Sequence, residues 1–171
     1  MTADLGALTG GDGRWDLTFV RRYPHPPERV WEAITDPELR KGWFPDTVEG
    51  EFVAGAALRF VTGYEEVPSF AGSVLAADPP KRLEIAWGTD VLRFVLEPDG
   101  EGTVLRFTDT ITELGKAARD SAGWHVCLEN LGAVVTGAPP PGDDGGRWAG
   151  VHPAYVAALG PAASTIGPPT A

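Results

Sequence analysis

Apolar and polar positions alternate through the middle of the chain, between residues 48 and 111. Turn-forming Gly, Pro and Asp residues divide this region into short segments, a pattern typical of strands joined by tight turns. An earlier segment alternates in the same way, with Trp15, Leu17 and Phe19 on one face. The connections are too short for parallel crossovers, so we predict an antiparallel meander of about seven strands. These strands are expected at residues 14–23, 48–53, 57–64, 68–77, 82–87, 91–97 and 103–111.

Helical spacing appears in other segments. Residues 26–35 begin with prolines and place apolar residues on one face, and residues 35–42 begin with Asp36 as a helix N-cap. Residues 116–136 are long enough to cover the sheet, since a helix of this length spans roughly 30 Å. They carry an apolar stripe at helical spacing: Trp124, Leu128, Leu131 and Val135. The sequence therefore predicts an α+β fold in which a curved antiparallel sheet wraps around a long C-terminal helix, with two short helices after the first strand.

The two ends of the chain lack this periodicity. Residues 1–13 are rich in Gly, Thr and Ala, and we expect a flexible leader there. Residues 14–137 are predicted to form the single domain. Residues 138–171 are expected to contain a Pro- and Gly-rich loop, a short helix at 153–159 and a tail with the composition of disorder.

The charge of the chain argues against a nucleic-acid-binding face. There are 14 Lys and Arg against 24 Asp and Glu, which gives a net charge of −10, whereas phosphate binding needs clustered basic residues. No apolar run approaches the roughly 18 residues that cross a bilayer. The N-terminus has no export signal, and Cys127, as the only cysteine, cannot form an internal disulfide. We expect a cytoplasmic protein with no membrane insertion and no nucleic-acid partner.

Three phrases in the chain carry a family resemblance. They are PPERVWEAITDP at residues 26–37 with Trp43 and Phe44 soon after, DPPKRL at 78–83 followed by Trp87, and GWHVCLENL at 123–131. Together they resemble the Hsp90-ATPase-activator-like branch of the START/Bet v 1 superfamily over residues 14–137. This resemblance implies the helix-grip fold and an apolar cavity between sheet and helix, which in relatives holds lipids or hydrophobic metabolites. The chain departs from many relatives in having Asp109 where a His is expected.

The motifs of several enzyme classes are missing from the sequence. The three histidines have no metal-ligand spacing, no serine lies in a nucleophile elbow, and no nucleotide-binding glycine loop follows a strand. We therefore expect no metal and no cofactor. His125, next to Trp124 on the long helix, is expected on a solvated flank, although it could also point toward the cavity mouth.

The aromatic residues of the inner face are the strongest functional signal, although they could equally be simple core packing. We predict that a small hydrophobic molecule binds among them, and that the binding residues are Trp43, Phe60, Phe70, Trp87, Phe94, Phe107, Asp109, Trp124, Leu128 and Leu131. Two alternatives stay open. One is a chaperone- or stress-linked interaction module, which the family resemblance suggests. The other is a cyclase- or hydratase-type enzyme with Asp109 or His125 as acid or base. A homodimer through a sheet edge or the C-terminal region is a further hypothesis.

Overall fold

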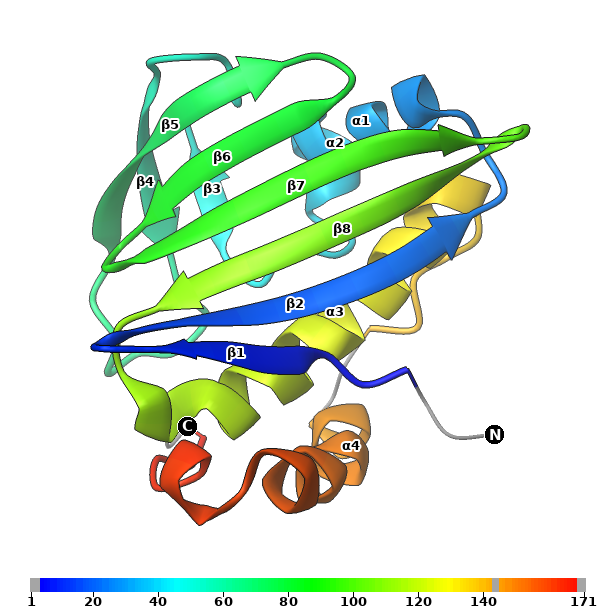
Figure 1. Ribbon diagram of the computed structural model, residues 1–171. Helices are drawn as coiled ribbons and strands as arrows, with labels where there is room; N and C mark the ends of the chain where they lie inside the picture. Colours follow the sequence, from blue (N-terminus) through cyan, green and yellow to red (C-terminus); the bar gives the residue numbers. More distant parts are fainter. Residues whose placement is uncertain (1–3, 143–144, 169–171) are drawn as a thin grey trace.

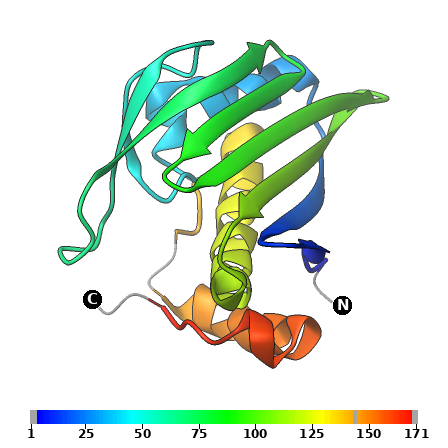
Figure 2. The same cartoon turned by 60° about the vertical axis from the view of Figure 1, so that its left-hand side comes forward.

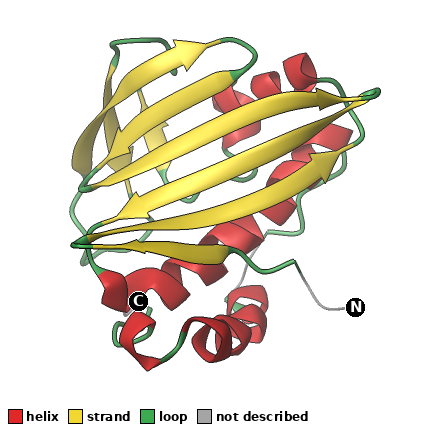
Figure 3. Ribbon diagram, in the orientation of Figure 1, coloured by secondary structure: helices red, strands yellow, loops and turns green. Residues whose placement is uncertain are grey.

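The computed structural model describes residues 4–142 and 145–168, and in it one curved antiparallel sheet wraps around a long helix (Figure 1). The sheet has eight strands in the order β1-β2-β8-β7-β6-β5-β4-β3. Their bounds are β1 Ala7–Gly11, β2 Arg14–Tyr23, β3 Thr47–Glu49, β4 Ala57–Val61, β5 Phe70–Asp78, β6 Arg82–Trp87, β7 Asp90–Asp99 and β8 Gly102–Ile111. The helices are α1 Pro27–Thr35, α2 Pro37–Arg40, η1 Leu114–Lys116, α3 Ala117–Thr136, α4 Gly146–Leu159 and η2 Pro161–Ala163 (Figure 3).

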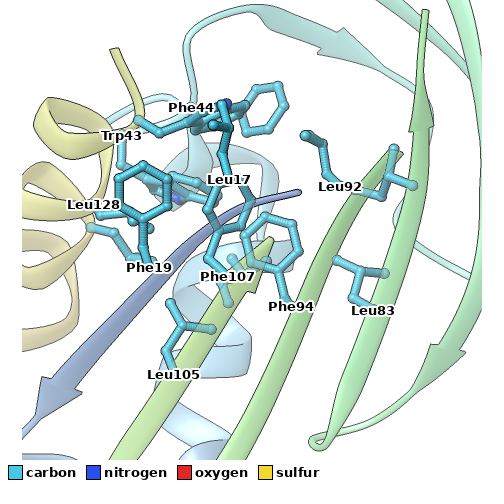
Figure 4. Close-up of a cluster of buried hydrophobic side chains, with 14 of the residues drawn as sticks. Leu17, Phe19, Trp43, Phe44, Leu83, Leu92, Phe94, Leu105, Phe107 and Leu128 are labelled. Carbon is cyan, nitrogen blue, oxygen red and sulfur yellow. The ribbon is translucent and has the colours of Figure 1, made fainter. Parts of the chain in front are cut away.

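The strand pairing brings aromatic residues into one row across the concave face. Phe19 of β2 is opposite Phe107 of β8, which in turn is opposite Phe94 of β7. All three rings are buried, and the centres of Phe94 and Phe107 lie 4.9 Å apart. Figure 4 shows these rings together with Trp43, which follows α2, and Leu128 of α3. The predicted α+β fold, with its curved sheet and long C-terminal helix, is thus confirmed.

The long helix α3 lies in the concave face and ends where the sequence predicts. The predicted stripe, Trp124, Leu128, Leu131 and Val135, is buried. Gly137 closes the helix with φ of 78°, a left-handed conformation that glycine adopts without steric cost. Arg29 of α1 donates to the carbonyl oxygens of Val134 and Val135, at 3.1 Å each. These bonds satisfy carbonyl groups of the last helical turn and hold α1 against α3.

The structure corrects the expected leader at residues 1–13. Ala7–Gly11 forms β1, which pairs with β2 at the edge of the sheet, so the sheet has eight strands where we expected about seven. Asp12 and Gly13 join the two strands, and both have positive φ. An Asp-Gly pair favours this kind of two-residue hairpin turn, so the signal was present in the sequence. Residues 1–3 lie outside the described part of the chain.

The C-terminal segment also differs from the expectation of a short helix and a disordered tail. Helix α4 begins at Gly146 instead of residue 153 and lies against the N-terminal half of α3 (Figure 2). Tyr155 of α4 and Ala163 of η2 are buried, and the N–H of Ile166 donates to Gly115 O at 3.0 Å. The described part of this segment is therefore packed against the domain, since the ring of Tyr155 lies 5.8 Å from that of His125 on α3 and 6.4 Å from that of Phe19 on β2.

The other predicted elements agree with the structure apart from small changes at their ends. The predicted strand 48–53 is reduced to β3, because the chain then turns and buries Phe52 beneath the guanidinium of Arg40, 4.1 Å from the ring centre. No helix in residues 4–142 and 145–168 combines the length and apolar character that a membrane span requires.

Candidate functional site

An open cleft with a volume of about 510 Å³ lies where the β4–β5 loop and the β6–β7 turn approach the first half of α3. Its apolar wall is largely aromatic. The ring centres of Phe70 and Trp87 are 5.8 Å apart, and those of Trp87 and Trp124 are 5.4 Å apart. Trp148 of α4 extends this wall at the outer end. The volume falls within the range of roughly 300–1,000 Å³ that is usual for small-molecule sites.

A second cleft, of about 680 Å³, adjoins the first. The two clefts form neighbouring parts of one depression between the sheet mouth, α3 and α4, because they share six lining residues: Pro45, Tyr64, Arg119, Gly123, Cys127 and Trp148. Gly123 faces open space, since no heavy atom lies within 4 Å of the position that a Cβ would occupy. The absence of a side chain at this position leaves room in the middle of the depression.

Asp46, in the segment before β3, supplies one carboxylate to the cleft wall. It is half-buried, and its Oδ2 accepts a hydrogen bond from Trp87 Nε1 at 2.8 Å. Burial raises the pKa of Asp46, and the bond from Trp87 offsets part of this effect. The same contact fixes the orientation of the indole of Trp87.

Lys116 lies between two further carboxylates at the inner end of the cleft. Its ammonium donates to Asp90 and lies 3.5 Å from Asp120 Oδ2, while Arg119 Nε contacts Asp120 Oδ1 at 2.7 Å. Burial disfavours the charge on Lys116, but the bond to Asp90 and the nearby carboxylates outweigh this and raise its pKa. The lysine stays charged at neutral pH and ties the start of β7 to the start of α3.

Asp109, on the inner face of β8, lies beneath the aromatic wall. It is 0% exposed; its Oδ2 accepts from Trp124 Nε1 at 2.8 Å, and its Oδ1 has no hydrogen-bond partner among the described residues. Burial, followed by the charges of Asp90 and Asp120, raises the pKa of Asp109 well above its ordinary value. The side chain is thus held as a neutral carboxylic acid over a wider pH range than an exposed aspartate.

Asp90, Asp109 and Asp120 have carboxylate oxygens within 4.8 Å of one another, close enough to suggest a metal site. A metal ion requires ionised ligands, whereas burial disfavours the ionised form of Asp109 and raises its pKa. Lys116 already places a positive charge beside Asp90 and Asp120. The cluster is therefore better suited to holding the lysine than to holding a metal ion.

The predicted binding residues fall into two groups. Phe70, Trp87 and Trp124 line the first cleft, and Trp43 lines the second. The others are buried in the core and line neither of these clefts: Phe60, Phe94, Phe107, Asp109, Leu128 and Leu131. The polar residues Asp46, Asp90, Lys116 and Asp120 were not predicted, because only the folded chain brings them beside the aromatic wall.

His125 is buried, which corrects the expectation that it lies on a solvated flank. Its Nε2 lies 3.4 Å from the carboxylate of Glu129, and its Nδ1 lies 2.9 Å from the hydroxyl of Tyr155. That hydroxyl also accepts a hydrogen bond from the N–H of Gly6 at 2.9 Å. Burial, followed by the charge of Arg21, lowers the pKa of His125. A neutral His125 that donates from Nε2 can accept from Tyr155 at Nδ1, so this group joins α3, α4 and the segment before β1.

Comparison with solved structures finds the same fold in several proteins. A conserved protein of unknown function from Enterococcus faecalis, EF2215, has a TM-score of 0.74 and 22% identity, with 90% of each chain covered. CalU16 from Micromonospora echinospora has a TM-score of 0.68 and 23% identity, over 90% of this chain and 96% of that one. DynU16, described as a protein in the dynemicin biosynthetic locus, has a TM-score of 0.63 and 25% identity, over 76% of this chain and 50% of its own.

Comparison by sequence identifies the family. No curated protein matches the chain at a significant level. Residues 24–136, most of the chain, match the family described as activator of Hsp90 ATPase homolog 1-like protein. These residues include all three phrases on which the resemblance was based, and the similar structures share the arrangement of sheet and long helix. The chain therefore belongs to the activator of Hsp90 ATPase homolog 1-like family and has the helix-grip fold of the START/Bet v 1 superfamily.

Proposed function

We propose that this protein binds a small hydrophobic molecule in the cleft between the sheet mouth and α3, against Phe70, Trp87 and Trp124. The observation that carries the proposal is the cleft itself, with its volume of about 510 Å³ and its aromatic wall. When an apolar ligand binds there, the apolar surfaces of the ligand and of the cleft leave water. This stabilises the complex by about 25 cal/mol per Å² of apolar area.

The deeper part of the predicted cavity is filled by side chains. Trp43 packs edge-on against Phe94 at 6.0 Å between ring centres, and Phe107 lies 4.7 Å from Trp124. An occupant of the open cleft would rest on this layer without displacing it. The proposed site is thus narrower than the set of residues predicted from sequence, and it adds Trp148 and the polar residues of the cleft.

Binding of a small molecule is preferred over the two alternatives because the aromatic cleft of this chain supports it. The interaction with a chaperone rests on the family description alone. For an enzyme, Asp109 would need to reach a substrate, yet it is fully buried behind Trp124 and His125 is engaged with Tyr155 and Glu129. One similar structure, DynU16, belongs by its description to a biosynthetic locus, which agrees with a small-molecule ligand.

A cleft-filling substitution tests this proposal. Gly123→Trp would place an indole in the open space in the middle of the depression. Glycine inside a helix is about 1 kcal/mol less favourable than alanine, and tryptophan lies between the two, so folding should be preserved in both variants. We expect isothermal titration calorimetry to detect binding of a neutral probe, 1-naphthalenemethanol, to the natural protein and to Gly123→Ala, and at least tenfold weaker binding to Gly123→Trp. Equal binding to all three proteins, or no binding to the natural one, would contradict the proposal.

A further inference from the structure

One carboxylate in the cleft lacks a positively charged partner. Among the described residues, Asp90 contacts Lys116, and Asp120 contacts both Lys116 and Arg119. Asp46 forms no ion pair with any described Lys, Arg or His side chain, and it accepts a hydrogen bond from the neutral indole of Trp87. The two basic residues of the cleft are thus occupied by other acids, and Asp46 leaves an uncompensated negative charge in its wall.

The surroundings of Asp46 suit a cation better than they suit water alone. It is half-buried and bonded to Trp87, whose ring packs edge-on against Phe70 and Trp124. Taking a carboxylate partly out of water is unfavourable unless a cation or donors replace the lost water. Aromatic faces attract cations through the ring quadrupole, most strongly in tryptophan. Carboxylate and indole together therefore present a place for a positively charged group beside an apolar wall.

We propose that the ligand of this cleft carries a basic amine, whose ammonium group contacts Asp46 while its apolar body lies against Trp87, Phe70 and Trp124. This inference rests on the proposed function and specifies the chemical class of the ligand. An acidic ligand would meet the uncompensated carboxylate of Asp46 and is disfavoured by the same geometry.

Three probes with the same aromatic body test the charge preference. They are 1-naphthylmethylamine, which is cationic at neutral pH, 1-naphthalenemethanol, which is neutral, and the anion of 1-naphthaleneacetic acid. We expect the amine to bind the natural protein about tenfold more tightly than the alcohol, equivalent to about 1.4 kcal/mol, and the acetate to bind more weakly than both. In Asp46→Asn the amide oxygen can still accept from Trp87, so the fold and the affinity for the alcohol should be retained while the amine loses its advantage.

General attraction of cations to an acidic protein is the main confounding effect. The net charge is −10, and Asp99→Asn is a matched control because it removes one negative charge at an exposed position in the β7–β8 hairpin. We expect Asp99→Asn to keep the full amine preference at physiological salt. If the alcohol binds as tightly as the amine, or if Asp46→Asn keeps the preference, the amine proposal is wrong while hydrophobic binding stands. If none of the probes binds the natural protein, both proposals fail.

Discussion

Asp109 is a single residue whose burial affects the pH dependence of the whole protein. Its side chain is 0% exposed and its Oδ1 has no hydrogen-bond partner among the described residues, so ionisation inside the fold is unfavourable. Below about pH 4 both the folded and the unfolded chain hold the proton. As the pH rises, the unfolded chain releases it first, because burial raises the pKa of Asp109 in the folded state. The contribution of Asp109 to stability is therefore lost as the pH rises toward that folded-state pKa.

Asp109→Asn should remove this loss. Asparagine keeps an oxygen that can accept from Trp124 Nε1 and cannot ionise. We expect the variant to gain stability relative to the natural protein as the pH rises from about 4 toward the folded-state pKa of Asp109, by up to about 1.4 kcal/mol per pH unit. Urea unfolding at several pH values measures the difference. A difference that stays constant with pH, or that shrinks as the pH rises, would show that Asp109 does not hold its proton in the fold.

The sequence predicts the aromatic half of the cleft and misses its polar half for a physical reason. Trp87 and Trp124 follow from local periodicity, one in a strand and one on a helix stripe, and periodicity reports burial. Asp46 and Lys116 lie in irregular or short segments, and their contacts join parts of the chain that are distant in sequence. Local pattern carries no information on such pairs.

At the scale of elements, Tyr155 joins three parts of the chain that the sequence left separate. Its hydroxyl bonds to the N–H of Gly6 and to His125, and its ring packs against Phe19 at 6.4 Å between centres. Tyr155→Phe keeps the ring and leaves two buried groups without a partner. We expect a loss of about 1–3 kcal/mol in the free energy of unfolding, and faster hydrogen exchange at the Gly6 amide.

Tyr64→Phe is the matched control, because Tyr64 is 45% exposed and the loss of its hydroxyl leaves no buried group unsatisfied. Its effect on stability should stay within about 0.5 kcal/mol. Equal unfolding free energies for the two variants would mean that the Tyr155 hydroxyl does not hold α4 and the N-terminal segment to α3.

The elements that the sequence predicts well are those with strong periodicity. β2 and β6 have the bounds that their alternation indicates, and α3 differs by one residue at its start. β1 and the first half of α4, residues 146–152, were missed because both are rich in small residues. β1 is held in place by pairing with β2, and α4 is held by burial of Tyr155. Both are tertiary effects that override weak local propensity.

For the whole molecule, family membership and fold are established, and the central claim is that the open cleft holds a small hydrophobic molecule. A ligand that binds there would also stabilise the folded chain by mass action. Because the cleft is open and lies above a packed aromatic layer, such a ligand can enter and leave without opening the sheet.

Native mass spectrometry of the protein, isolated gently from its own cells, tests this claim most directly. The natural protein should carry a reproducible extra mass of small-molecule size that is lost on denaturation, and Gly123→Trp prepared in the same way should not. If the natural protein and the variant carry the same extra mass, or if both have only the mass of the bare chain, the cleft is not the binding site that we propose.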